Sequence, residues 1–99
     1  MEILSLLQFF SLCHEFLLNA GTIELVESQM AHQTSVVLAF KAFLQGGVPL
    51  PVFMPLDEAI AMLEQELVNR QATLCRLTEF HGALLDNQQY LVLKMGLLR

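Results

Sequence analysis

Three histidines and two cysteines are the side chains of this sequence best suited to hold a metal or to act as nucleophiles. They are His14, His32, His81, Cys13 and Cys75. Zinc sites use ligand pairs a few residues apart, whereas Cys13 and His14 are adjacent and would point about 100° apart on a helix. The Glu-x-x-His pattern of di-iron bundles is also absent, because Glu79 and His81 have the wrong spacing. We therefore expect no metal and no cofactor, with a site shared across subunits by the histidines as the alternative.

Catalytic motifs are missing as well. The single Gly-Gly pair, Gly46–Gly47, does not belong to a phosphate-binding loop, and no G-x-S-x-G stands in the chain. Neighbouring carboxylates such as Asp57 and Glu58 are best explained as solvated charges or as charges that complement a helix dipole. The sequence predicts a protein that is not an enzyme.

Charge limits the classes of partner. The net charge is −5 with five Lys and Arg residues, so no basic patch for nucleic acid can be assembled, and attraction to an anionic membrane is disfavoured. The apolar segment 2–18 starts with Glu2 and is interrupted by Gln8, His14 and Glu15, which favours a mostly buried helix over a signal peptide or a membrane span. We expect a cytoplasmic protein with reduced cysteines, an intersubunit disulfide being the alternative.

Composition points to an interface. Hydrophobic residues make up 55% of the 99-residue chain and charged residues only 15%, whereas average domains carry about 25% charged residues. A single domain of this size has a modest core, so the missing charge must appear as apolar surface. Contiguous apolar surface usually marks an interaction site. We expect an obligate oligomer, with a dimer favoured, or one subunit of a hetero-complex.

The first half of the chain predicts two helices, over residues 2–20 and 22–45. In the first, apolar side chains recur at steps of three and four: Ile3, Leu6, Leu7, Phe10, Cys13, Leu17 and Leu18. Phe9 and Phe16 widen that face. A polar stripe that includes Asn19 should lie opposite. Gly21 is a good helix stop and Thr22 a suitable N-cap. The β-branched residues of 22–26 and 34–38 leave a strand as the alternative for the second helix.

Residues 46–55 form a predicted linker with an unusual composition. Its prolines exclude helix. Yet every residue between Val48 and Leu56 that is not a proline is apolar. We expect this segment to strap across helix faces. A Pro-rich recognition motif is the alternative.

The second half predicts one long helix over about 56–95, with a break near 82–87 as the alternative because Gly82 is unfavourable and Asp86 could cap a new helix. The pattern is heptad-like. The a positions are Ile60, Leu67, Leu74, His81, Gln88 and Met95. The d positions are Leu56, Leu63, Arg70, Leu77, Leu84, Leu91 and Leu98.

These elements predict an all-α fold: a small helical bundle with a long coiled-coil-like C-terminal helix, two N-terminal helices and the Pro-rich apolar linker, all within one domain over residues 1–99. A second apolar ridge at Ala61, Val68 and Cys75 favours three or more packed helices. The a and d positions form the seam along which a coiled-coil helix meets its partner helix. Polar residues on this seam can fix register and partner choice, a role we assign to Arg70, His81 and Gln88. The predicted partner or oligomer interface consists of Phe53, Leu56, Ile60, Leu63, Leu67, Arg70, Leu74, Leu77, His81 and Leu84.

The sequence thus predicts a non-enzymatic protein–protein interaction module, an oligomerisation or assembly subunit that buries apolar helix faces. Its composition is similar to that of small acidic helical chaperones. The alternative is a ligand-responsive sensor that binds a hydrophobic molecule between helices. Its pocket would be lined by Phe9, Phe10, Phe40, Phe43 and Met62.

Overall fold

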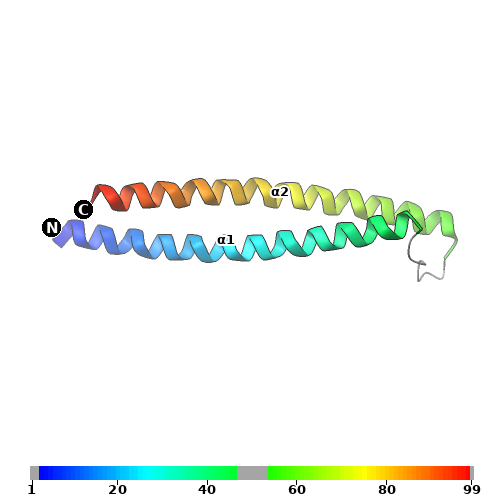
Figure 1. Ribbon diagram of the computed structural model, residues 1–99, viewed down its shortest axis with the longest axis horizontal. Coiled ribbons are helices and arrows are strands. Elements are labelled where there is room, and N and C mark those ends of the chain that lie inside the picture. Colours follow the sequence, from blue (N-terminus) through cyan, green and yellow to red (C-terminus); the bar gives the residue numbers. More distant parts are fainter. Residues whose placement is uncertain (1–2, 47–53, 99) are drawn as a thin grey trace. The chain divides into compact units, whose positions relative to one another are not determined.

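The computed structural model describes residues 3–46 and 54–98. It contains two long helices, α1 (Ile3–Leu44) and α2 (Leu56–Leu97), and no strand within these ranges (Figure 1). The all-α prediction is confirmed. The prediction of two N-terminal helices is wrong, because a single helix covers both of their ranges.

Gly21 does not stop α1. A glycine in a helix costs about 1 kcal/mol relative to alanine, and the buried residues on either side, Asn19 and Ile23, outweigh that cost. Thr22 does not cap a new helix either: its hydroxyl donates to the carbonyl of Leu18, 2.9 Å away, one turn earlier in the same helix. The β-branched segments that left a strand as the alternative are helical.

Local signals explain the other helix ends. Gly46 has φ +77° and follows the last turn of α1, where its amide donates to the carbonyl of Phe43 at 3.1 Å. That left-handed conformation is the one that glycine adopts most easily at a helix C-terminus. The helix α2 begins after Pro55, carries Asp57 and Glu58 in its first turn and passes through Gly82 without a break. The predicted strap, including Phe53, lies for the most part outside the described residues.

The chain divides into two compact units. We call Met1–Ser28 with Glu79–Arg99 the terminal unit, and Gln29–Thr78 the middle unit. In each, a segment of α1 lies beside an antiparallel segment of α2 (Figure 1). The buried hydrophobic side chains are few: Ile23, Val26 and Leu91 in the terminal unit, and Val37 and Ala59 in the middle unit.

Each helix has a heptad-spaced stripe of mostly buried and half-buried residues, its seam, which faces the other helix within each unit. Between Leu56 and Leu98, twelve of the thirteen a and d positions are buried or half-buried, the exception being Leu56. On α1 the inward positions also alternate by three and four residues: Ser5, Phe9, Leu12, Phe16, Asn19, Ile23, Val26, Met30, Gln33, Val37, Phe40 and Leu44. Phe9 and Phe16, which widen the apolar face predicted for the first helix, are among these inward residues, but most of that predicted face is not. Ile3, Leu17 and Leu18 from that face are 78%, 68% and 60% exposed.

Candidate functional site

The seam of the terminal unit contains a buried polar cluster around Asn19. This side chain is only 8% exposed. Its amide nitrogen Nδ2 donates to Gln88 Oε1 at 2.7 Å and to the Leu84 carbonyl at 3.0 Å, and its Oδ1 accepts from Asn87 Nδ2 at 2.9 Å. A satisfied amide inside an apolar seam penalises every shifted pairing of the helices, because a shift would bury these groups without partners. The cluster therefore sets the register of the terminal unit.

Asn19 was missed by the sequence analysis, which placed it in an outward polar stripe. The available signal was the spacing of Phe9, Leu12, Phe16, Asn19 and Ile23, which continues through Gly21. Gln88, which the sequence assigned to register, is the partner of Asn19.

His81 lies one to two turns away on the same seam. Its Nε2 is 3.6 Å from Glu27 Oε1, which is too long for a hydrogen bond, so this buried nitrogen has no partner. The Glu27 side chain is 58% exposed and the His81 side chain 22%. This layer of the seam is polar but incompletely satisfied.

In the middle unit the polar layer contains Arg70. Its Nε donates to Glu66 Oε1 at 2.9 Å, and its Nη1 donates to Gln33 Oε1 at 3.4 Å. The ion pair is formed within α2 and is about two-fifths exposed on both sides, so its contribution to stability is small. Each of the three polar residues that the sequence placed on the α2 seam thus faces a polar side chain of α1.

The predicted partner interface lies on this same seam of α2. Ile60, Leu63 and Leu67 are half-buried, as are Arg70, Leu74, Leu77, His81 and Leu84. Within this single chain α1 lies against that seam. Leu56 is exposed and Phe53 lies outside the described residues. The assignment of these residues to a partner interface stays a prediction.

The five residues predicted to line an apolar pocket are divided between the units. Phe9 and Phe10 belong to the terminal unit, and Phe40, Phe43 and Met62 to the middle unit. A groove of about 280 Å³ in the middle unit is lined by Met62 together with Met54, Ala59, Leu63 and Glu66. The sensor alternative therefore stays a prediction.

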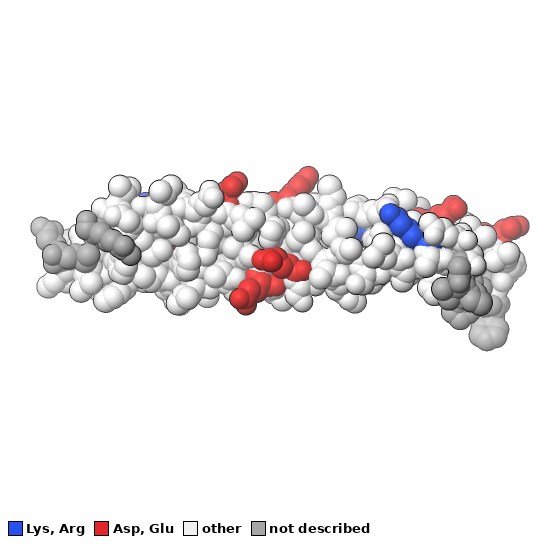
Figure 2. Space-filling view, viewed as in Figure 1, with Lys and Arg blue, Asp and Glu red and all other residues white. Residues whose placement is uncertain are grey.

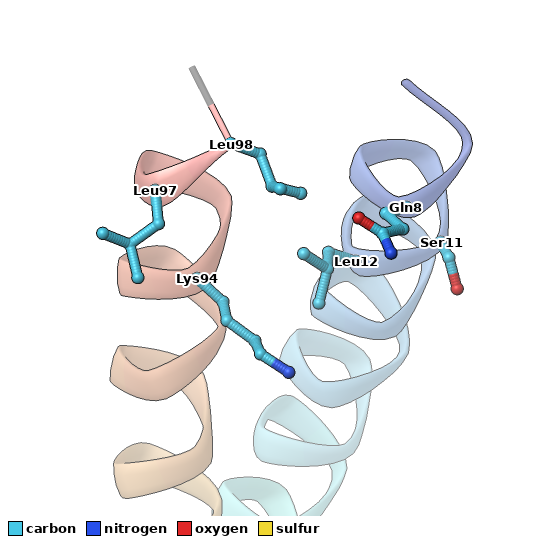
Figure 3. Close-up of a pocket in the computed structure, with 6 residues that line it drawn as sticks. All are labelled: Gln8, Ser11, Leu12, Lys94, Leu97 and Leu98. Carbon is cyan, nitrogen blue, oxygen red and sulfur yellow. The ribbon is translucent and has the colours of Figure 1, made fainter. Parts of the chain in front are cut away.

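A larger groove, of about 420 Å³, lies in the terminal unit near the ends of the helices. Leu12, Lys94 and Leu98 point toward the space between the two helices, and Gln8, Ser11 and Leu97 complete the lining (Figure 3). The Lys94 ammonium also lies 5.3 Å from the centre of the Tyr90 ring, within cation–π range. The lining of this groove is partly polar, and the groove lies on one side of the terminal unit.

Metal-binding side chains do not gather in the part of the chain that the structure describes. No three His, Cys, Asp or Glu residues there come close enough to hold an ion. His14 and His32 are exposed, Cys75 is exposed, and the half-buried Cys13 has its sulfur 3.7 Å from that of Met95. Both cysteines are free.

Exposed apolar surface is the dominant feature of the molecule. Nineteen large hydrophobic side chains among the described residues are exposed, and seven of them lie on α1 between Ile3 and Leu18. Residues 3–14 contain no Asp, Glu, Lys or Arg, and residues 87–98 contain only Lys94. On the face shown in Figure 2, the end of the terminal unit that carries these residues is almost free of charge.

The described residues include one helix, α1, that is long and apolar enough to cross a membrane by length and composition alone. Only 6% of its most apolar stretch is buried, whereas the sequence predicted a mostly buried helix. Core helices and signal sequences meet the same criterion, so this observation by itself does not assign α1 to a membrane.

Comparison of the chain with protein-family models, with curated proteins and with solved structures finds no match.

Proposed function

We propose that this chain is a non-enzymatic interaction module, a helical oligomerisation or assembly subunit that buries apolar helix faces by coiled-coil packing against itself or a partner. The observation that supports the proposal is the imbalance between exposed and buried apolar side chains. Five hydrophobic residues are buried and nineteen large ones are exposed among the described residues. Monomeric soluble proteins rarely expose so much contiguous apolar surface.

The polar seam residues support a role in assembly rather than in chemistry. Asn19 and Gln88 bond to each other, and Arg70 bonds to Glu66 and Gln33. Polar side chains that are hydrogen-bonded in this way can fix the register of the helices. A fixed register presents the outward apolar side chains in one defined pattern, which a specific partner requires.

Thermal unfolding at different chain concentrations tests this proposal. If association buries the exposed faces, a hundredfold increase in concentration should raise the Tm by about 5–10 °C, because only the folded chain associates. Circular dichroism at about 1 µM and about 100 µM measures the shift. A Tm that is the same at both concentrations, in a chain that stays monomeric, would contradict self-association as the function.

A further inference from the structure

Among the described residues, the terminal unit carries a second heptad-spaced set of uncharged residues, apolar along α1, most of which are exposed. It flanks the inward seam and alternates by three and four residues along α1. We call it, with the equivalent flank of α2, the apolar flank. On α1 it consists of Ile3, Leu6, Phe10, Cys13, Leu17 and Ala20, and on α2 of Gly82, Leu85, Gln89, Val92 and Gly96.

The two halves of this flank lie on the same side of the terminal unit. In an antiparallel helix pair, the positions on one side of the seam of one helix meet the equivalent positions of the other. The groove of Figure 3 fixes this pairing, because its lining residues Gln8 and Ser11 on α1, and Lys94 and Leu97 on α2, occupy the equivalent positions on the opposite side. The apolar flank is therefore one continuous surface.

Most of the flank is exposed in the single chain, while Cys13 and Ala20 are half-buried. Ile3 is 78% exposed, Phe10 57% and Leu17 68% on α1, while Leu85 is 44% and Val92 51% exposed on α2. A Cβ added at Gly82 or Gly96 would meet no atom of this chain within 4 Å. These two glycines leave room beside the flank for bulky side chains of a partner.

We propose that the apolar flank of the terminal unit is the surface on which a second copy of this chain docks, so that two helix pairs form a four-helix bundle. This inference rests on the proposed function. The apolar side chains of this flank recur at steps of three and four residues, so a partner helix can pack its own apolar stripe along them. A second copy brings a flank with the same spacing.

Charge favours a second copy on this flank. Each chain carries a net charge of −5, so two copies repel unless the surfaces that meet are free of charge. The eleven residues of the apolar flank include no Asp, Glu, Lys or Arg. The first acidic side chains beyond it on α1, those of Glu24 and Glu27, lie at its edge.

On α1 the opposite side of the terminal unit is more polar than the apolar flank. Its positions over the same turns combine three leucines with four polar or charged residues: Leu4, Gln8, Ser11, Glu15, Leu18, Thr22 and Leu25. Docking on the apolar flank would cover Leu17 and leave Leu18 in solvent, although both are about equally exposed in the single chain, at 68% and 60%. This adjacent pair of leucines makes a matched test.

Leu17→Glu and Leu18→Glu add the same charge and the same helix propensity at neighbouring positions. We expect Leu17→Glu to weaken self-association at least about 30-fold, because it places a carboxylate within an apolar interface. Leu18→Glu should change the dissociation constant by less than about threefold. Sedimentation velocity over a dilution series of the full chain measures both constants.

Thiol labelling provides a second test with milder substitutions. In a chain with Cys13→Ala and Cys75→Ala, either Leu17→Cys or Leu18→Cys supplies the only thiol. At concentrations where the chain is assembled, the thiol at position 17 should react with a maleimide about tenfold more slowly than that at position 18, and the difference should vanish on dilution. Equal rates at both positions under assembly conditions would overturn the proposed flank.

The outcomes separate this inference from the proposed function. A wild-type chain that assembles, with both glutamate variants weakened equally, overturns the flank and leaves the interaction module standing. A monomeric wild-type chain whose Tm does not depend on concentration overturns both. A chain that is monomeric in buffer and sediments with phosphatidylcholine vesicles overturns the second copy as the occupant, in favour of lipid.

Discussion

Leu91→Ala should destabilise the chain by about 2–4 kcal/mol. Leu91 is 2% exposed and is the largest of the most deeply buried side chains. Truncating it removes apolar contacts and leaves a cavity between two helices whose backbones cannot close on it without disturbing the Asn19 cluster. Urea unfolding followed by circular dichroism, at one chain concentration for all variants, measures the loss.

Leu93 supplies the matched control. It is two residues away on the same helix, has the same side chain and is 69% exposed. Leu93→Ala should change the free energy of unfolding by less than about 0.5 kcal/mol. Equal losses for the two variants would mean that α1 does not cover the α2 seam in the terminal unit.

Asn19→Ala should cost about 1–3 kcal/mol, because it leaves Gln88 Oε1 without its donor in a half-buried position and removes the acceptor of Asn87. The double change Asn19→Leu with Gln88→Leu should recover that loss, since replacing both partners of a buried hydrogen bond by apolar groups leaves nothing unsatisfied. The same urea titration measures both.

Asn87→Ala is the control for the cluster. Asn87 is exposed and gives Asn19 a single hydrogen bond, so its loss should cost no more than about 0.5–1 kcal/mol. If the free energy of unfolding is lower for Asn19→Leu with Gln88→Leu than for Asn19→Ala, the polar cluster contributes net stability. That result would contradict a role of the cluster in register alone.

The inward face of α2 could be predicted from the sequence because only one set of heptad positions, a and d, is consistently apolar along the helix. The a and d pattern runs from Ile60 to Leu98 with polar residues only at Arg70, His81 and Gln88, and every one of those positions is at least half-buried. The polar residues on it were identified as well. The α1 residues that face them, Asn19, Glu27 and Gln33, could not be predicted, since their positions depend on how α1 packs against α2 within each unit.

The first half of α1 was assigned the wrong inward face, because it carries two heptad-spaced apolar phases. One contains Phe10 and Leu17, and the other contains Phe9, Leu12 and Phe16. The first is more apolar over the first turns, but only the second continues past Gly21 into Ile23 and Val26, which are buried. Treating Gly21 as a helix stop hid that continuation.

A helix with two apolar phases is what a chain needs when one phase pairs its own helices and the other meets a partner. The face that was expected to pack within the chain is the one that our proposal assigns to a second copy. The sequence-level expectation of excess apolar surface and the exposed flank therefore have the same physical origin, a shortage of charged residues between Ile3 and Ile23.

Size-exclusion chromatography with multi-angle light scattering, run on the wild-type chain over a dilution series, measures whether the chain assembles with itself. We expect a helical species with twice the 11.1-kDa mass of one chain, which dissociates only on dilution. A monodisperse, fully helical species with the mass of a single chain at every concentration would contradict this expectation.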